Sequence, residues 1–184
     1  IHVTWPKETR VPCPSCGVLC AVEDHRDVRS WRHLDTMQFR TILTCRIPRA
    51  YCPNHGVKTI AVPWAGSSSR FTLLFERFAV DVFRTARSQT AACALLRISW
   101  DQAQLLMERA VERGLSRRDC SGIRYLGLDE KSFGKGQSYG SLATDLDQGR
   151  VLDVVPGRTR EAADALWAAI PAAVRSSCTA VAID

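Results

Sequence analysis

The sequence contains no long apolar run, and no segment approaches the roughly 18 apolar residues that a membrane-spanning helix requires. The first residues also lack the basic, then apolar, then small-residue order of a secretion signal. Hydrophobic residues still make up 46% of the 184 residues, which is ample for packed cores. We therefore expect a soluble, non-membrane protein with one medium-sized domain or two to three small ones.

Lysine is scarce, since it supplies only four of the 25 cationic residues. The charge is also unevenly distributed along the chain. Residues 1–124 hold 19 Lys and Arg against 11 Asp and Glu, whereas residues 125–184 hold 6 against 8. A basic front part favours a polyanionic partner such as nucleic acid, through contacts with phosphates. The alternative is an arginine-rich composition that reflects codon usage alone.

Eight cysteines in a chain without a secretion signal indicate bound metal or free thiols rather than disulfides. Two segments share one pattern, because Cys13-Pro-Ser-Cys16 and Cys52-Pro-Asn-His55 have the same spacing and are each followed by glycine. Glycine permits the tight turn that directs two ligands at one ion. We predict a structural zinc ion held by these four residues.

Other ligands remain open at this stage, namely Cys20, Cys45, His25 and His33. An iron–sulfur cluster is a weaker alternative, because a fourth thiolate at the required spacing is missing. Between the two pairs, residues 37–47 alternate apolar and polar side chains, which predicts one half-buried strand with Met37, Phe39 and Cys45 on its apolar face. The zinc would then hold a small β module together.

Three helices are expected after a Pro-, Gly- and Ser-rich stretch at residues 62–69 that resembles a linker. The first helix follows from helical spacing of apolar residues and has Glu76 on its exposed face. A short alanine-rich helix spans residues 89–96, and a Ser99/Gln102 capping box begins the third helix, which runs to about residue 113. The apolar stripe of the first helix comprises Phe71, Leu74, Phe75, Phe78, Val82 and Phe83.

A short helix, a tight turn and a capped helix are typical of a helix-turn-helix. We predict two groups of DNA-contacting residues. The major groove would be read by Trp100, Asp101 and Gln104, and the phosphates would lie near Arg97, Arg109 and Arg113. A three-helix bundle without a DNA-binding role would show the same periodicities, and Asp101 would repel phosphates.

The last sixty residues predict a sheet, with strands at 126–129, 138–144 and 150–155, a helix between Thr159 and Pro171, and a strand at 178–183. Asp129 is the last residue of the first of these strands, and Asp184 directly follows the last one. A carboxylate in that position needs a counter-ion or a metal. Three antiparallel strands, a crossing helix and a returning strand are the start of a ribonuclease H-like domain, which would make the two aspartates neighbours.

The expected fold class is therefore multidomain α+β. It combines a small zinc-binding β module, a helical helix-turn-helix domain and the N-terminal part of a ribonuclease H-like α/β domain. The predicted divisions are a zinc-binding module at 1–63, a linker at 64–70, a helix-turn-helix at 71–118 and an incomplete catalytic domain at 119–184.

This order of parts resembles the ISL3 family of bacterial insertion-sequence transposases. The matching stretches are residues 13–17, 31–35, 52–56, 62–65, 126–130 and 151–158. The resemblance implies zinc at the four ligands above, and Asp129 and Asp184 as the first and second acids of a DDE triad. The third acid would lie on a helix beyond Asp184, so we expect a truncated chain. His55 is a departure, because the family more often has cysteine there.

By this resemblance the protein is a DNA transposase that binds element ends and carries out metal-dependent strand cleavage and strand transfer. Two catalytic Mg²⁺ ions would bind Asp129 and Asp184. The implied partners are double-stranded DNA, as terminal repeats and as target, and further copies of the chain in a homodimer or larger complex. The implied location is the bacterial cytoplasm, in association with the nucleoid. The rival functions are a DNA-binding regulator or decayed transposase without catalysis, and a structure-specific nuclease.

Overall fold

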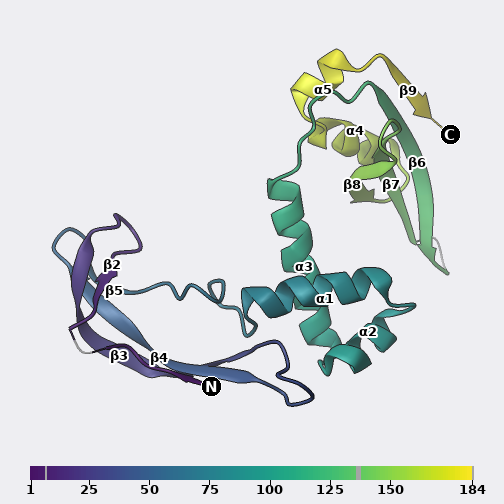
Figure 1. Cartoon of the computed structure of the whole chain (residues 1–184). Helices are drawn as coiled ribbons and strands as arrows, with labels where there is room; N and C mark the ends of the chain where they lie inside the picture. Colours follow the sequence, from purple (N-terminus) through teal and green to yellow (C-terminus); the bar gives the residue numbers. More distant parts are fainter. Residues whose placement is uncertain (7, 136–137, 184) are drawn as a thin grey trace. The chain divides into compact units, whose positions relative to one another are not determined.

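The structure, a computed structural model, describes all residues except 7, 136, 137 and 184. It divides into two units, Ile1–Ser116 and Arg117–Asp184 (Figure 1). The described residues form two sheets and five helices, which confirms that the chain mixes helices and strands. No described helix is long and apolar enough to cross a membrane.

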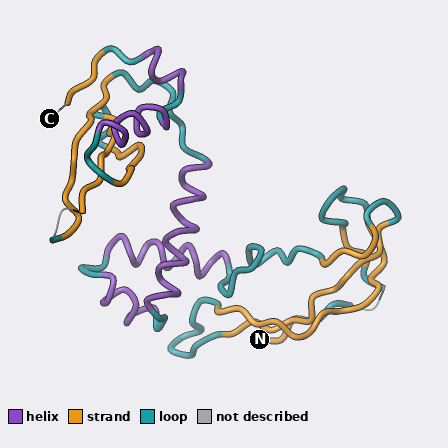
Figure 2. The backbone as a smooth tube through the Cα atoms, turned by 180° about the vertical axis from the view of Figure 1, so that it is seen from behind, coloured by secondary structure: helices purple, strands orange, loops and turns teal. Residues whose placement is uncertain are grey.

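The first unit begins with a long antiparallel hairpin that is shown as extended orange strands in Figure 2. Its two strands are joined by shorter ones in the order β1-β4-β3-β2, and β5 also pairs with β4. Irregular register within the β3–β4 pair marks bulges, which bend and twist such ribbons. The strands are β1 (His2–Val3), β2 (Arg10–Pro12), β3 (Leu19–Arg32), β4 (Ile42–Cys52) and β5 (Gly56–Thr59).

The core of this β module is built on tryptophan. Trp31 is fully buried, and its ring meets the edge of Trp64 with 5.6 Å between centroids. Trp5 stacks on the other side of Trp64 at 6.5 Å. The stretch that begins at Trp64 is therefore packed against the sheet at its start, with Ala65 buried, rather than free of the β module.

The predicted strand at residues 37–47 is wrong over its first part. Thr36 and Phe39 exchange both backbone hydrogen bonds, each 3.1 Å long, and so close a turn around Met37. β4 begins only at Ile42, and Met37 and Phe39 are 88% and 76% exposed. The alternation of apolar and polar residues begins before β4, in the turn around Met37. A turn has no strand pleat that could bury one face, so the apolar side chains there stay exposed.

Each helix of the first unit begins at a side-chain cap, and the cap of the third helix is the one that the sequence predicts. The hydroxyl of Ser99 accepts from the backbone amide of Gln102 at 3.2 Å, and the Gln102 side chain accepts from the Ser99 amide at 3.1 Å, which confirms the capping box. Thr72 and Ser88 cap the two preceding helices by accepting the backbone amides of Phe75 and Ala91. The helices are α1 (Leu73–Thr85), α2 (Gln89–Leu96) and α3 (Trp100–Ser116).

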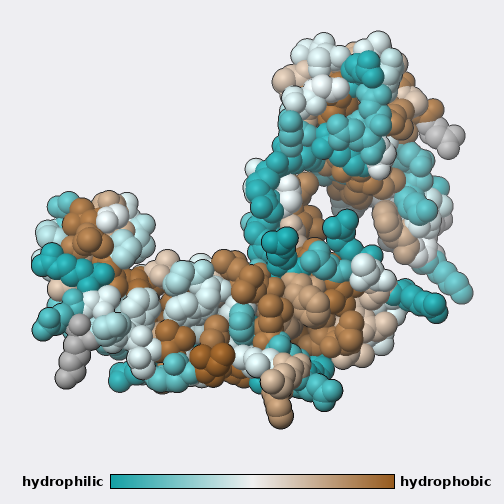
Figure 3. Space-filling model, in the orientation of Figure 1, coloured by the Kyte–Doolittle hydropathy of each residue, from teal (hydrophilic) through white to brown (hydrophobic). Residues whose placement is uncertain are grey.

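The predicted apolar stripe of α1 is only half correct. Phe71, Phe75 and Val82 are buried against α2 and α3, together with Leu106. Leu74 and Phe78, however, are 57% and 47% exposed. The space-filling view shows that apolar side chains also form patches among polar ones on the surface (Figure 3). Glu76 is buried on the face of α1 that packs against α3, so Leu74 and Phe78 on other faces of the helix stay exposed.

The second unit is a four-stranded sheet in the order β8-β7-β6-β9. The first three strands are antiparallel and β9 runs parallel to β6, where Leu128 pairs with Ile183. The short helix α5 was not predicted, because the proline at position 171 indicates the end of a helical segment. In the structure the carbonyl of Pro171 accepts the backbone amide of Val174 and so begins a new helical turn. The elements are β6 (Tyr125–Gly134), β7 (Ser138–Asp145), β8 (Arg150–Pro156), α4 (Arg160–Ala169), α5 (Ala172–Ser177) and β9 (Ala180–Ile183).

We predict that Phe75→Ala destabilises the first unit by about 3–5 kcal/mol, because a buried aromatic side chain leaves a cavity when it is truncated. Phe78→Ala is the matched control on the same helix and should stay within about 1 kcal/mol of the parent. Urea unfolding followed by the helical circular dichroism signal measures both. Equal losses in the two variants would show that the buried face of α1 is assigned incorrectly.

Candidate metal centre and nucleic-acid interface

Four ligand atoms gather where two tight turns of the β module meet. The sulfurs of Cys13, Cys16 and Cys52 and a ring nitrogen of His55 all lie within 4.8 Å of one another. The distance between the sulfur of Cys52 and the Nδ1 of His55 is 3.6 Å, and that between the sulfurs of Cys16 and Cys52 is 3.7 Å. The sulfur of Cys13 lies 3.8 Å from the Nδ1 of His55. A tetrahedral zinc ion with bonds of about 2.0–2.3 Å places its ligand atoms roughly 3.5–3.8 Å apart. The cluster therefore fits such an ion.

The two turns place their ligands by the same local geometry. Gly17 donates to the carbonyl of Cys13 at 2.8 Å, and the amide of His55 donates to the carbonyl of Cys52 at 3.2 Å. Gly17 and Gly56 both have positive φ, at 74° and 68°, which other residues adopt only with strain. The first turn joins β2 to β3 and the second joins β4 to β5, so a metal ion there would tie the two turns together at one end of the sheet.

The electrostatics of the cluster favour a thiolate. The hydrogen bond with His55 lowers the pKa of Cys52 to about 6, although burial acts in the opposite direction. A thiolate, not a thiol, is the form that binds metal. Cys52 and Cys13 are buried, whereas Cys16 and His55 lie at the surface, so an ion could enter from solvent.

The alternative ligands lie outside this cluster of described residues. The thiol of Cys20 donates a hydrogen bond to the carbonyl of Val18, and burial raises the pKa of this thiol. Cys45 is fully buried and accepts the indole N–H of Trp5 at 3.2 Å, so it is a core residue. His33 lies beside α1, where its Nδ1 is 2.8 Å from the hydroxyl of Thr72.

The residues predicted to read DNA lie at the exposed start of α3. Trp100 is 54% exposed, and Asp101 and Gln104 are also exposed. Gln104 donates to Glu108 one turn further on at 3.0 Å. The N-terminal turn of α3 therefore offers aromatic, amide and carboxylate groups to a partner.

The three arginines predicted near phosphates each have a carboxylate partner. Arg109 and Arg113 lie 3.5 Å and 2.7 Å from oxygens of Glu76, and Arg97 pairs with Asp35. Glu76 is only 2% exposed, which overturns its predicted place on the outer face of α1. The sequence feature that indicates a buried Glu76 is the pair of arginines, Arg109 and Arg113, spaced one turn apart on α3, because both face Glu76 on α1.

In the second unit, Asp129 lies at the surface beside a small pocket of about 120 Å³. One of its oxygens accepts the backbone amide of Glu130 at 2.6 Å, and no salt bridge to Asp129 is found in the described part of the chain. β9 ends next to it, since Leu128 pairs with Ile183. The second predicted acid, Asp184, lies outside the described residues.

Asp145 illustrates a carboxylate with a structural role. It is 1% exposed and contacts Arg150 at 3.1 Å, and its other oxygen accepts the backbone amides of Asp147 and Gln148 in the β7–β8 turn. Asp145 ends its strand and was not among the predicted metal ligands, whereas Asp129 was. The environments of the two residues differ accordingly, because only Asp145 is buried and saturated with donors.

A cysteine–histidine cluster in a β module, a capped helix-turn-helix and a sheet in the second unit define a modular protein. Three family models match consecutive parts of the chain. The zinc-finger of transposase IS204/IS1001/IS1096/IS1165 matches residues 9–55, the helix-turn-helix domain of transposase family ISL3 matches 60–111, and the ISL3 DDE transposase domain matches 126–184. The chain belongs to the ISL3 family of transposases, which confirms the resemblance inferred from its motifs.

Curated relatives agree with this membership. The chain is 30% identical over 176 residues to the transposase for insertion sequence element IS1557 from two strains of Mycobacterium tuberculosis, covering 94% of the chain and 39% of each relative. It is 27% identical over 173 residues to the transposase for IS1001 from Bordetella parapertussis, covering 94% of the chain and 42% of the relative. The chain thus spans about two fifths of these relatives' length. No solved structure matches it.

We expect the purified protein to hold one zinc ion per chain and Cys52→Ser to lose it, because three ligands of this set bind zinc far more weakly than four. Cys20→Ala is the matched control, since Cys20 is a buried neighbour outside the cluster, and it should keep its zinc. Native mass spectrometry with elemental analysis measures both. Loss of zinc from the Cys20 variant alone would move the site to a different ligand set.

Proposed function

We propose that the chain forms part of a DNA transposase of an insertion sequence, in which the first unit binds the element ends and the second begins the catalytic domain. The observation that carries this proposal is the parallel pairing of β9 with β6 in the segment matched by the DDE transposase model. It places β9, which Asp184 directly follows in sequence, beside the residues of β6 that immediately precede Asp129.

The sheet supports a ribonuclease H-like assignment for the second unit. Three antiparallel strands, a helix and a fourth strand that returns parallel to the first are the beginning of that fold. Leu128 and Ile183 are register partners, and they immediately precede Asp129 and Asp184 in the sequence. We assign the two aspartates as metal-binding acids on this basis and on family membership.

The donor chemistry suits a divalent metal. Asp129 offers hard carboxylate oxygens at the surface, which Mg²⁺ prefers, and its charge is not consumed by a salt bridge among the described residues. In phosphoryl transfer on DNA, bound Mg²⁺ would activate the attacking oxygen and stabilise the leaving oxygen. The role of Asp129 is to hold a metal beside the scissile phosphate, and the same role for Asp184 follows from the proposal.

We assign DNA end recognition to the start of α3, through Trp100, Asp101 and Gln104. Arg97, Arg109 and Arg113 are between 30% and 48% exposed. Each guanidinium can therefore hold its carboxylate partner and still direct remaining N–H groups at a phosphate. We further propose zinc as the structural ion of the β module, and an active complex of at least two chains, because two element ends must be joined.

The catalytic assignment predicts that Asp129→Asn in the full-length protein lowers Mg²⁺-dependent cleavage of a duplex carrying the element end by at least about 100-fold. Binding to the same duplex should be unchanged, since Asp129 lies in the second unit. Asp153→Asn is the matched control, because Asp153 also lies on a strand and accepts the next backbone amide, at 2.8 Å. It should cleave normally.

Three outcomes separate the rival functions. Cleavage that survives Asp129→Asn contradicts the catalytic role of this residue. A parent protein that binds the element end and does not cut it under any metal favours a DNA-binding regulator. Cutting of branched or flapped DNA without regard to sequence favours a structure-specific nuclease.

A further inference from the structure

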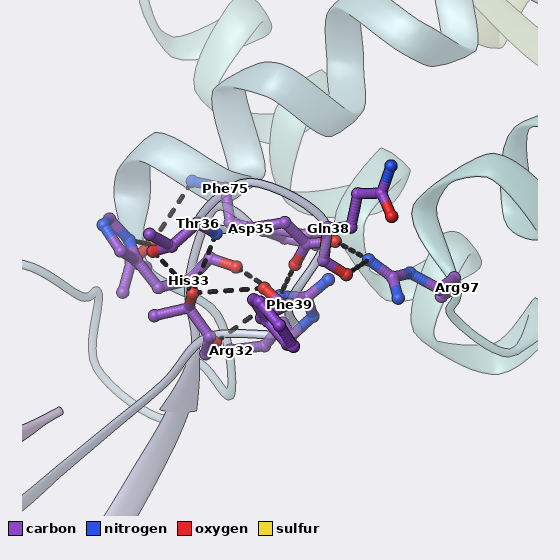
Figure 4. A network of polar contacts seen from close by, with 10 residues as sticks. Arg32, His33, Asp35, Thr36, Gln38, Phe39, Phe75 and Arg97 are labelled. Carbon is purple, nitrogen blue, oxygen red and sulfur yellow. Dashed lines mark hydrogen bonds and ion pairs between the residues drawn. The ribbon is translucent and has the colours of Figure 1, made fainter.

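The loop that joins β3 to β4 is held against the turn of the helix-turn-helix (Figure 4). Arg97, which lies between α2 and α3, points to this loop, where it pairs with Asp35 and donates to the carbonyl of Gln38 at 3.2 Å. Arg97 has left-handed backbone angles, with φ 56° and ψ 48°. A residue other than glycine adopts them only with strain, and the ion pair with Asp35 offsets that strain.

Asp35 is held from the other side by the end of β3. Arg32 pairs with the same carboxylate, is only 5% exposed, and places its guanidinium 5.0 Å from the ring centroid of Phe75 on α1. The hydrogen bond from Arg32, reinforced by Arg97, lowers the pKa of Asp35 against the opposing effect of desolvation. Asp35 is therefore ionised at neutral pH and links the β hairpin to the helices as one body.

The tip of the loop, residues 36–40, presents a distinct set of side chains to solvent. Met37 and Phe39 are among the most exposed apolar residues described, and Met37 has a φ of 58°. Gln38 and Arg40 are exposed beside them, and no salt bridge to Arg40 is found among the described residues. A strained turn that keeps two large apolar side chains in water has no evident benefit for folding, which points to a partner.

The turn is nonetheless rigid at its base. The hydroxyl of Thr41, a buried residue, accepts the amide of Thr36 at 3.0 Å, and the Arg32 guanidinium donates to the carbonyl of His33 at 2.6 Å. These bonds fix the direction in which the tip projects. Because the Arg97 turn immediately precedes the Ser99 cap of α3, the tip and the exposed start of α3 lie at the same end of the helical part (Figures 1 and 2).

We propose that the tip, residues 36–40, is a wing that contacts duplex DNA beside the groove occupied by α3. The inference rests on the proposed DNA-binding function. Arg40 would pair with a phosphate, and Met37 and Phe39 would pack against the sugars or wedge into a base step of the adjacent minor groove. Gln38 is placed to reach base edges.

Double-stranded DNA fits this tip better than a protein partner. Residues 1–124 carry 19 cationic against 11 acidic side chains, and the one acid next to the tip, Asp35, is neutralised by two arginines. Apolar side chains flanked by arginine are the combination that minor-groove proteins insert into DNA. A helix in one groove and a rigid turn in the next would also lengthen the site that is read.

The test uses photo-crosslinking to a duplex selected from a random 30-bp library by the unmodified chain. p-Benzoylphenylalanine replaces Phe39 in one preparation and Tyr51 in the control, because Tyr51 is a 54% exposed aromatic residue at the far end of β4. We expect a DNA crosslink from position 39 that is at least about 10-fold stronger than from position 51. Equal, weak crosslinking from both positions would overturn the wing.

A second measurement uses the combined variant Met37→Ser, Phe39→Ser and Arg40→Gln. Its affinity for the same duplex should fall by about 10-fold or more, and its hydroxyl-radical footprint should shorten on one side. Arg26→Gln is the control, an exposed arginine on β3 away from the tip, and should change affinity by less than about twofold. Retained zinc and an unchanged circular dichroism spectrum show that the variants fold.

The outcomes distinguish this inference from the proposal on which it rests. A parent chain that enriches no duplex from the library contradicts the DNA-binding function itself. A parent chain that binds, with unchanged affinity and footprint in the combined variant, contradicts the wing alone and leaves recognition to α3.

Discussion

A charge removed from water must be paired, and this constraint organises both units of the protein. Asp35, Glu76 and Asp145 are each largely withdrawn from solvent and each held by arginine. Glu76 draws α3 onto α1, Asp35 joins the hairpin to the helical turn, and Asp145 closes the β7–β8 turn. Asp129 is the contrast, because it is exposed and free of such a salt bridge among the described residues. A carboxylate in that state is available for a metal.

The zinc cluster and the hairpin tip lie at opposite ends of the same two strands. β3 runs for 14 residues and β4 for 11, so at about 3.3 Å per residue the two features are on the order of 35 Å apart. The cluster holds the ends of four strands, and the Asp35 network holds the other end against the helices. The first unit is therefore braced at both ends, which suits a surface that must meet DNA in one orientation.

Features with a local cause were predictable. The two metal-ligand turns, Cys13–Gly17 and Cys52–Gly56, depend on ligands three residues apart and on a glycine with positive φ. The Ser99/Gln102 capping box depends on atoms within one helical turn. The strands of the second unit followed from short apolar runs and turn residues. The prediction failed at Met37, which lies outside β4, because periodicity does not show where a strand begins. It failed at Phe78, inside α1, because helical spacing does not show which neighbour covers each face of a helix.

The sequence by itself determined the order of modules and the four ligands that lie together in the structure, because each depends on neighbours within a few residues. Only the tertiary structure decided which charges are buried and what they hold. Arg97 was predicted only as a phosphate contact, and the structure adds an ion pair with Asp35, 62 positions away. Pairing across such distances depends on how the elements pack, and that packing turned an expected strand residue, Met37, into the tip of a projecting loop.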